Sequence, residues 1–126
     1  MSKTIINTPN APAPIGPYSQ AVSANGMLFV SGQIPIIPET GELEGSGIQA
    51  ETAQVMKNLE AILKEAGADF SQVVKTSIFV ADMSDFSVVN EVYGQYFTEN
   101  PPARETVAVR TLPKNVNVEI SCIAAL

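Results

Sequence analysis

Two runs of alternating side chains near the C-terminal end constrain the fold more than any other feature of the sequence. They cover residues 104–110 and 116–122, and Leu112-Pro113-Lys114-Asn115 lies between them. Such alternation predicts two β-strands joined by a short turn, so we expect Arg104 and Glu119 to lie on neighbouring strands. Because successive side chains of a strand point to opposite faces, Glu119 should face away from an apolar layer. That layer is expected to contain Val116, Val118, Ile120 and Cys122.

Length and residue inventory limit the number of domains and the available chemistry. With 126 residues, the chain is long enough for a hydrophobic core, and we expect a single domain over residues 1–126. The sequence has no histidine and one cysteine, which excludes a Cys/His zinc site, a Ser-His-Asp triad and a Cys-His pair. Catalysis therefore has to use carboxylates, arginine, tyrosine, backbone groups or water, and we expect neither a metal nor a cofactor. Cys122 is expected to be a core residue.

Charge and hydropathy limit the partners. Seven basic and thirteen acidic residues give a net charge of −6, which opposes binding to a phosphate backbone. One arginine in a shielded pocket can still hold a small anion, so small carboxylates remain possible ligands. The first residues lack the apolar segment of a signal peptide, and no apolar run approaches the ~18 residues of a membrane span. With a lone cysteine, we expect a cytoplasmic protein without nucleic-acid or membrane partners.

Turn and helix signals divide the rest of the chain into elements. Asn25-Gly26 predicts a β-hairpin, because a type I′ turn needs positive φ at both central residues. Apolar residues at helical spacing predict a helix over residues 49–66, with Gly67 after its end. They also predict a second helix, which Ser84 caps and which Asn100-Pro101-Pro102 ends. Its apolar stripe is expected to comprise Phe86, Val89, Val92 or Tyr93, Tyr96 and Phe97.

The order of these elements predicts the fold class. Residues 4–6 and 73–80 are rich in β-branched side chains and predict two more strands. The expected fold is therefore α+β, a single sheet with two helices packed on one face. Two helices on one side leave the second face of the sheet uncovered, and its small and polar groups suit contact with another copy of the chain. We expect an oligomer.

Three motifs connect the sequence to a known family. They are Gly16-Pro17-Tyr18-Ser19-Gln20-Ala21, Phe29-Val30-Ser31-Gly32-Gln33 and Pro102-Ala103-Arg104. Together they resemble the Rid family, the reactive intermediate deaminases, and its RidA branch most closely, and the resemblance covers nearly the whole chain. It implies a bacterial chorismate-mutase-like fold and a homotrimer whose sheets form a central barrel, with sites in the clefts between subunits.

The same resemblance implies a function. Rid proteins of this branch are cofactor-free enzymes that hydrolyse 2-imino acids and their enamine tautomers to 2-oxo acids and ammonia. The implied substrates are 2-iminobutanoate and 2-iminopropanoate, which pyridoxal-phosphate dehydratases release from threonine and serine. In this scheme Arg104 binds the substrate carboxylate, and Glu119 positions or activates the hydrolytic water. The other positions that match the substrate pocket are Tyr18, Ser31, Gly32, Asn90 and Thr106.

Ordinary structural roles are the alternative for these residues. Arg104 would form a surface ion pair, and Glu119 would be an exposed strand carboxylate. Tyr18 would be a corner residue whose hydroxyl finds one partner. For Arg104 and Glu119 the match to the family motif favours the functional interpretation.

Two departures from the family pattern bear on substrate range. The archetypal sequence after Pro-Ala is Arg-Ser-Cys-Val, whereas this chain has Arg104-Glu105-Thr106-Val107. Thr106 can keep a backbone contact of the cysteine, and alternation predicts that Glu105 points away from Arg104. Downstream, Arg110 stands one residue earlier than the arginine of the family, which places it on the other face of the strand.

Three other functions stay open. A non-catalytic trimer could hold a small 2-oxo acid at Arg104 without turnover. Ribonuclease or translation-inhibitor activity has been attributed to relatives, but the acidic surface and the absence of histidine oppose it. Chorismate mutase activity is suggested by the fold alone, which is a weak basis for assigning a function.

Overall fold

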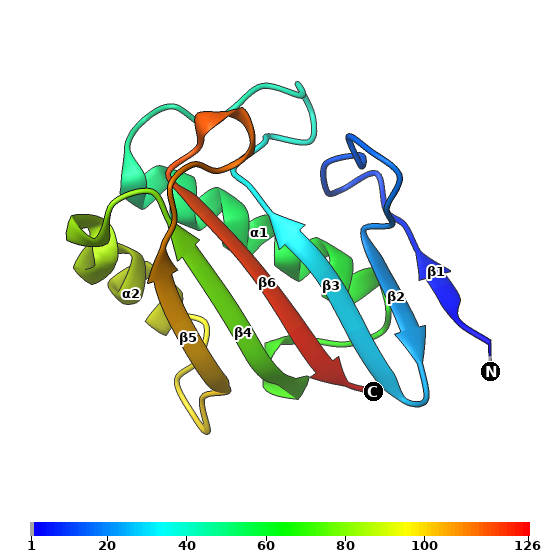
Figure 1. The fold of residues 1–126 in the computed structure, drawn as a ribbon. Coiled ribbons are helices and arrows are strands. Elements are labelled where there is room, and N and C mark those ends of the chain that lie inside the picture. Colours follow the sequence, from blue (N-terminus) through cyan, green and yellow to red (C-terminus); the bar gives the residue numbers. More distant parts are fainter. Residues whose placement is uncertain (1) are drawn as a thin grey trace.

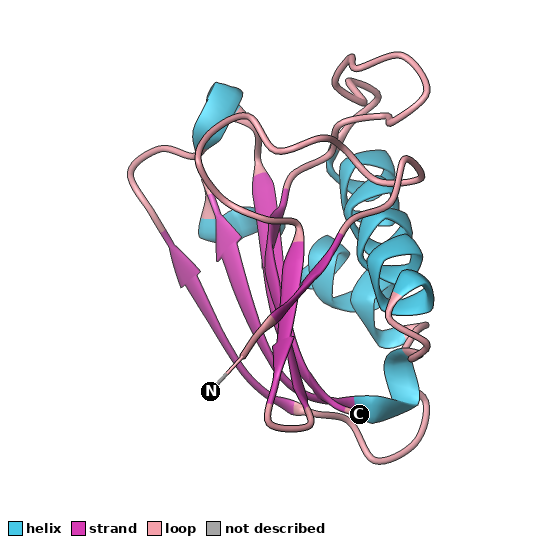
Figure 2. Cartoon of the chain, turned by 90° about the vertical axis from the view of Figure 1, so that its right-hand side faces the viewer, coloured by secondary structure: helices cyan, strands magenta, loops and turns pink. Residues whose placement is uncertain are grey.

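The computed structural model describes residues 2–126. Within that range one mixed β-sheet forms a layer, and two α-helices pack on one of its faces (Figure 1). From the side, the helices lie on one face of the strands and leave the other face uncovered (Figure 2). The predicted α+β arrangement is therefore confirmed.

The strands follow the order β1-β2-β3-β6-β4-β5 across the sheet. Their bounds are β1 Thr4–Ile6, β2 Ala21–Ala24, β3 Met27–Gln33, β4 Val73–Val80, β5 Ala103–Ala108 and β6 Val118–Ala125. The α-helices are α1 Ile48–Glu65 and α2 Phe86–Gly94, and short 3₁₀ segments cover Phe70–Gln72, Met83–Asp85 and Pro113–Asn115. The strands predicted at residues 4–6 and 73–80 thus form at those positions.

The hairpin between β2 and β3 turns where the sequence predicts it. Asn25 and Gly26 have φ values of 53° and 76°, the two positive values that a type I′ turn requires. Ala24 pairs with Met27 directly across the turn.

Helix α1 makes the main contact between the two layers. It starts and ends one residue earlier than predicted, and Gly67 follows it with a φ of 78°. Its buried apolar side chains are Val55, Met56, Leu59, Ile62 and Leu63. They share one core cluster with buried strand residues that include Leu28, Ile78, Val118 and Ile120. The apolar face predicted for residues 116–122 is confirmed, because Val116, Val118, Ile120 and Cys122 are all buried.

The entry into α2 differs from the prediction that Ser84 caps the helix. The Asp82 carboxylate accepts a hydrogen bond from the Ser84 backbone N–H at 2.9 Å, and this bond lowers the pKa of Asp82. Asp82 therefore caps a 3₁₀ turn that runs directly into α2, and Ser84 lies inside that turn. An aspartate and a serine are comparable N-caps, so the sequence around them did not determine where the turn begins.

The end of α2 also differs from the prediction. The helix stops at Gly94, before the Asn100-Pro101-Pro102 segment that was expected to end it. Tyr96 and Phe97 lie beyond the helix and pack on Phe70, with ring centroids 5.1 and 5.3 Å apart. These aromatic contacts hold the chain against the core without a helical backbone.

The prediction that the last two strands are neighbours joined by a turn is wrong. β4 lies between them, parallel to β5 and antiparallel to β6. The connecting residues 109–117 cross the end of β4 instead of forming a hairpin. The physical reason is burial: Thr76, Ile78 and Val80 of β4 are at most 1% exposed, whereas β5 has no fully buried residue. An apolar strand gains most at the centre of a sheet, and a polar strand is suited to its edge.

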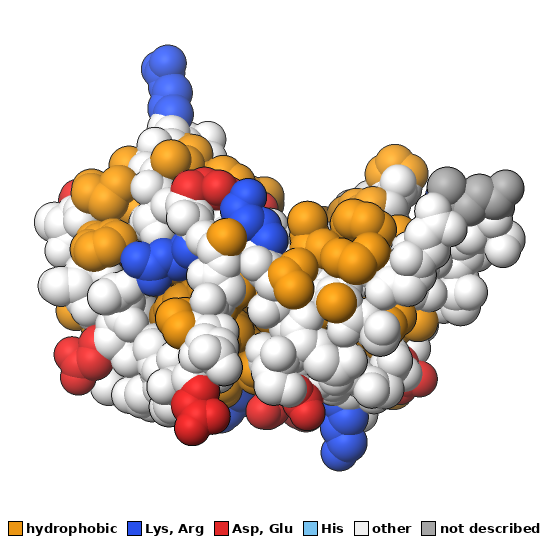
Figure 3. Space-filling view, turned by 90° about the horizontal axis from the view of Figure 1, so that it is seen from below, with side chains coloured by type: hydrophobic (Ala, Val, Ile, Leu, Met, Phe, Trp, Pro, Cys, Tyr) orange, Lys and Arg blue, Asp and Glu red, His pale blue; other side chains and the backbone are white. Residues whose placement is uncertain are grey.

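The register divides the side chains between a helix face and an open face. Thr76, Ile78 and Val80 face the helices, and Lys75, Ser77 and Phe79 face the other way. The open face also carries large apolar side chains, since Phe29 is 43% and Val107 is 42% exposed. In Figure 3 this face lies at the top, where it is hollowed and carries hydrophobic side chains.

Gly26→Ala should lower the free energy of unfolding by about 1–2 kcal/mol, because a side chain makes the left-handed backbone unfavourable. An added Cβ would meet no atom within 4 Å, so the loss would come from the backbone alone. Gly45 is the matched control, because its added Cβ also meets nothing within 4 Å and its φ lies outside the left-handed range. Gly45→Ala should be neutral or slightly stabilising. Urea denaturation at one fixed protein concentration compares the two, and equal losses would contradict the assignment of the turn.

Candidate active site

The residues predicted to form the site lie on both faces of the sheet. Arg104 pairs with Thr76 of β4, which is buried beneath the helices. Glu119 pairs with Phe79 of β4, on the open face. We call the first group, Arg104, Thr106 and Asn90, the arginine half-site. We call the second group, Tyr18, Ser31, Gly32 and Glu119, the glutamate half-site.

Helix α2 holds the side chain of Arg104. Arg104 Nη1 donates a hydrogen bond to Asn90 Oδ1 at 2.6 Å. The guanidinium carbon lies 5.1 Å from the ring centroid of Tyr93 and 5.7 Å from that of Phe86. Asn90 occupies one of the five N–H donors of the guanidinium, and Arg104 is exposed. Its planar fork is therefore suited to gripping a carboxylate through two parallel hydrogen bonds.

Thr106 adds a second polar group beside this arginine. It lies two residues along β5, on the same face as Arg104. Its hydroxyl oxygen is buried and has no hydrogen-bond partner within residues 2–126. A buried polar group without a partner costs about 1–3 kcal/mol. A ligand or a neighbouring chain that pairs with this hydroxyl would recover that cost.

Glu119 and Gly32 lie in contact on the open face. Glu119 is partly buried, and the desolvation raises the pKa of its carboxyl above the ordinary value of 4.5. A Cβ at position 32 would overlap the carboxylate, so only glycine permits this close approach. The ladder between β3 and β6 shifts register between Val30 and Gln33, which brings Gly32 to this position. A carboxyl group with a raised pKa, next to the backbone of a glycine, is suited to accepting a proton.

Tyr18 and Ser31 line a hollow of the surface. The hollow has a volume of about 380 Å³, and Val22 and Phe29 of the open face also line it. The Tyr18 hydroxyl accepts a hydrogen bond from the Ile15 N–H at 3.3 Å. Ser31 Oγ donates one to the Ser19 carbonyl at 2.6 Å. Tyr18 is 49% exposed, so its ring is available to a ligand.

The structure does not bring the two half-sites together within one chain. On β4, Thr76 is the cross-strand partner of Arg104, and Phe79 is the partner of Glu119. These two partners are three residues, or about 10 Å, apart along the strand. The two side chains also point to opposite faces of the sheet. One small ligand therefore cannot touch both within the same chain.

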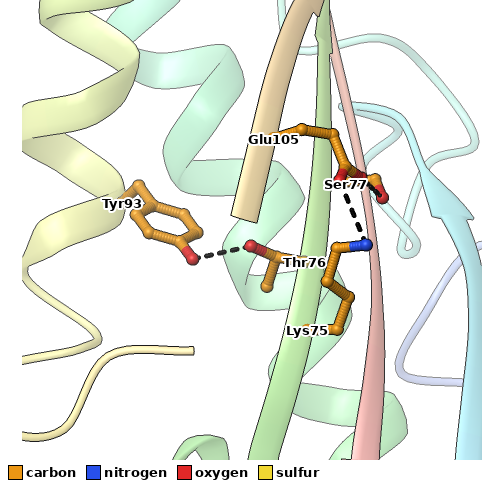
Figure 4. A network of polar contacts seen from close by, with 5 residues as sticks. All are labelled: Lys75, Thr76, Ser77, Tyr93 and Glu105. Atoms are coloured by element: carbon orange, nitrogen blue, oxygen red, sulfur yellow. Dashed lines mark hydrogen bonds and ion pairs between the residues drawn. The ribbon is translucent and has the colours of Figure 1, made fainter. Parts of the chain in front are cut away.

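Glu105 lies on the side of β5 opposite Arg104, as alternation predicts. Its carboxylate forms an ion pair with Lys75 Nζ at 3.0 Å and accepts a hydrogen bond from the Ser77 hydroxyl. These contacts, the Ser77 hydrogen bond first, lower the pKa of Glu105. Figure 4 shows this group on one side of β4, with Thr76 and Tyr93 on the other. Glu105 thus does not compete for Arg104 within the chain.

Two residues at the arginine half-site were missed as functional candidates. The apolar stripe predicted for the second helix contains Phe86 and either Val92 or Tyr93, yet the rings of Phe86 and Tyr93 both face Arg104. The signal was their spacing around Asn90, since i, i+4 and i+7 lie on one helical face. Cys122 is a core residue, as predicted, and burial raises the pKa of its thiol to about 12.

A larger cavity lies elsewhere. It has a volume of about 740 Å³ and lies beside α1, where Lys57, Glu60 and Lys64 line it. It contains none of the predicted site residues. Within residues 2–126, no group of three His, Cys, Asp or Glu side chains could hold a metal ion. No helix in the same part of the chain is long and apolar enough to cross a membrane.

Comparison with known proteins gives close matches over the whole fold. The family described as Endoribonuclease L-PSP matches residues 8–126. Reactive Intermediate Deaminase A, chloroplastic, of Arabidopsis thaliana is 49% identical over 100% of this chain and 67% of that protein. The 2-iminobutanoate/2-iminopropanoate deaminase of Homo sapiens is 47% identical over 97% of this chain and 89% of its own length. YyfA from Yersinia pestis, a protein of unknown function of the Rid protein family, superposes with a TM-score of 0.97 at 48% identity, over 99% of this chain and 100% of that one.

These matches cover both half-sites. The family match begins at residue 8 and continues to the last residue, so it includes every predicted site position from Tyr18 to Glu119. The mixed sheet with two helices on one face is also the fold of the Rid structure. The chain belongs to the Rid family, the group described as Endoribonuclease L-PSP.

Proposed function

We propose that the protein hydrolyses 2-iminobutanoate and 2-iminopropanoate, and their enamine tautomers, to 2-oxo acids and ammonia. The observation that carries this proposal is the arginine half-site, in which Asn90 and two rings hold an exposed guanidinium beside an unpaired Thr106 hydroxyl. Such a group is suited to a small carboxylate. The names of the human and Arabidopsis relatives, both deaminases, support the reaction class.

The proposed reaction uses water as its only co-reactant. Arg104 grips the substrate carboxylate. Glu119 accepts a proton from water while the water oxygen bonds to C2, and it passes this proton to the imine nitrogen, which gives a 2-amino-2-hydroxy acid. Glu119 then moves the proton of the new hydroxyl to the same nitrogen, and the C2–N bond breaks as the C2=O bond forms. The products are a 2-oxo acid and ammonia. Because a free imine already hydrolyses in water, positioning and one general base are sufficient for catalysis.

The proposed site needs two copies of the chain. Arg104 and Glu119 face opposite sides of one sheet, so the arginine half-site of one copy would meet the glutamate half-site of the next. The exposed apolar side chains Phe29 and Val107 on the open face support such an assembly. We propose a homotrimer in which the open faces line a central barrel. Tyr18, Ser31 and Gly32 of one copy and Asn90 and Thr106 of the next would line the pocket.

A coupled assay tests the reaction directly. A threonine dehydratase generates the unstable imine, and 2-oxobutanoate formation is followed with and without this protein. An enzyme accelerates the release of ammonia and 2-oxobutanoate, whereas a non-catalytic binder of 2-oxo acids leaves the rate unchanged. RNA binding at low salt distinguishes a ribonuclease, and the net charge of −6 opposes it.

Arg104→Ala should abolish turnover and leave the fold intact, because the guanidinium is exposed and not part of the core. Arg104→Lys should restore little activity, since an ammonium group cannot form two parallel bonds to a carboxylate. Steady-state kinetics and circular dichroism of both variants check this. Near-normal activity of R104K, or unfolding of R104A, would rule out the carboxylate grip.

Glu119→Gln should lower kcat by about 10²–10⁴-fold at nearly unchanged affinity for 2-oxobutanoate, because the amide keeps the shape but accepts no proton. In the wild type, kcat/KM should fall as the pH drops through the raised pKa of Glu119, above the ordinary 4.5. The pH profile of E119Q should lose this decrease at low pH. Glu105→Gln is the control, and it should keep both the wild-type kcat and the decrease at low pH because Glu105 faces Lys75. A fully active E119Q would mean that backbone groups alone position the water.

Mixing two inactive variants tests the shared site. R104A has a defective arginine half-site, and E119Q has a defective glutamate half-site. When the two variants refold together, some interfaces combine the intact arginine half-site of E119Q with the intact glutamate half-site of R104A. Random assembly at equal amounts makes about a quarter of the sites complete, which should restore about a quarter of the wild-type rate. Sedimentation equilibrium should show a trimer. No recovery in a co-assembled sample would contradict a site shared between two copies.

A further inference from the structure

Three residues of α2 form one stripe that faces Arg104. Phe86, Asn90 and Tyr93 are spaced i, i+4 and i+7, so their side chains share a helical face. Asn90 Oδ1 accepts a hydrogen bond from one guanidinium N–H. The two rings lie on either side of it in the sequence, both within 6 Å of the guanidinium carbon. That distance is within the range of a cation–π contact.

A buried hydroxyl pair fixes one of the rings. Thr76 Oγ1 and Tyr93 Oη lie 2.7 Å apart in a buried hydrogen bond, which Figure 4 shows between α2 and β4. Thr76 is also the cross-strand partner of Arg104. Thr76 therefore fixes both the position of Arg104 along β5 and the position of the Tyr93 ring next to Arg104.

Arg104 needs such support because of its position. It projects from β5, the edge strand of the sheet, and it is exposed. A free arginine side chain loses rotamer entropy when it binds a ligand. The hydrogen bond to Asn90 restrains one guanidinium nitrogen. By itself it leaves the guanidinium plane free to rotate about the hydrogen bond.

We propose that Phe86 and Tyr93 are positioning residues, whose rings form a shelf that fixes the plane of the Arg104 guanidinium for a carboxylate ligand. The Thr76–Tyr93 hydrogen bond holds the deeper ring, and Phe86, which is 37% exposed, covers the outer side. The shelf deepens the proposed function, because the ligand it serves is the carboxylate of the 2-imino or 2-oxo acid.

The arginine content of the chain makes a direct test simple. The sequence contains two arginines, Arg104 and Arg110, so ¹⁵N-arginine labelling yields two Nε–Hε signals. Arg110→Lys assigns them. Relaxation of the Arg104 Nε–Hε signal should show a restricted side chain in the ligand-free wild type, and Arg110, which is exposed, provides the comparison.

Phe86→Leu removes the outer ring and keeps an apolar side chain. It should increase the mobility of the Arg104 signal and leave Arg110 unchanged. It should weaken 2-oxobutanoate binding and raise KM by about two- to five-fold, the size of one exposed cation–π contact, with kcat nearly unchanged. Phe86→Tyr keeps a ring and should restore both values. Tyr93→Phe keeps the deeper ring but removes its hydrogen bond, so it should show a smaller increase in mobility.

Two results would overturn the shelf. One is an Arg104 signal in F86L that is as restricted as in the wild type, with unchanged 2-oxobutanoate affinity. The other is an F86Y variant as impaired as F86L, because a lost ring could not then explain the effect. Failure of the proposed function is a separate outcome: the wild type would not accelerate imine hydrolysis, while the relaxation data would still report on the shelf.

Discussion

The position of β4 between β5 and β6 is the constraint on which the rest of the structure depends. The helix face of β4 is buried, as is that of β6, whereas β5 has no buried residue. The register of β4 with each neighbour decides where their side chains point. Arg104 is placed on the helix face, against α2, and Glu119 on the open face, against Gly32. A sheet in which β5 and β6 paired directly would have given these two residues other neighbours.

This separation also keeps Arg104 and Glu119 from neutralising each other. An arginine and a glutamate on adjacent strands of one face would form an ion pair, and neither would be available to a ligand. Arg104 instead has a neutral acceptor, Asn90, and the nearby Glu105 is paired with Lys75 on the far side of the sheet. The structure thus leaves the Arg104 guanidinium and the partly desolvated Glu119 carboxylate available to other partners.

Edge position and burial give the two half-sites different requirements. The arginine half-site belongs to an edge strand, so a neighbouring helix has to supply its support, and the stripe from Phe86 to Tyr93 does so. The glutamate half-site belongs to an inner strand, where close packing places the carboxylate beside Gly32 and raises its pKa. The arginine half-site therefore depends on side-chain contacts, and the glutamate half-site depends on the absence of a side chain at Gly32.

The sequence by itself determined the local structure: the Asn25-Gly26 turn, the span of α1, the strand at residues 73–80 and the apolar face around Ile120. These follow from periodicity and backbone preference, which act between residues close in the chain. Motif resemblance supplied the candidate residues and the family. Only the tertiary structure decided that β4 separates the last two strands, that Asp82 starts the turn into α2, and that Phe86 and Tyr93 contact Arg104. Each depends on which distant segments pack together, and no local pattern encodes that competition for burial.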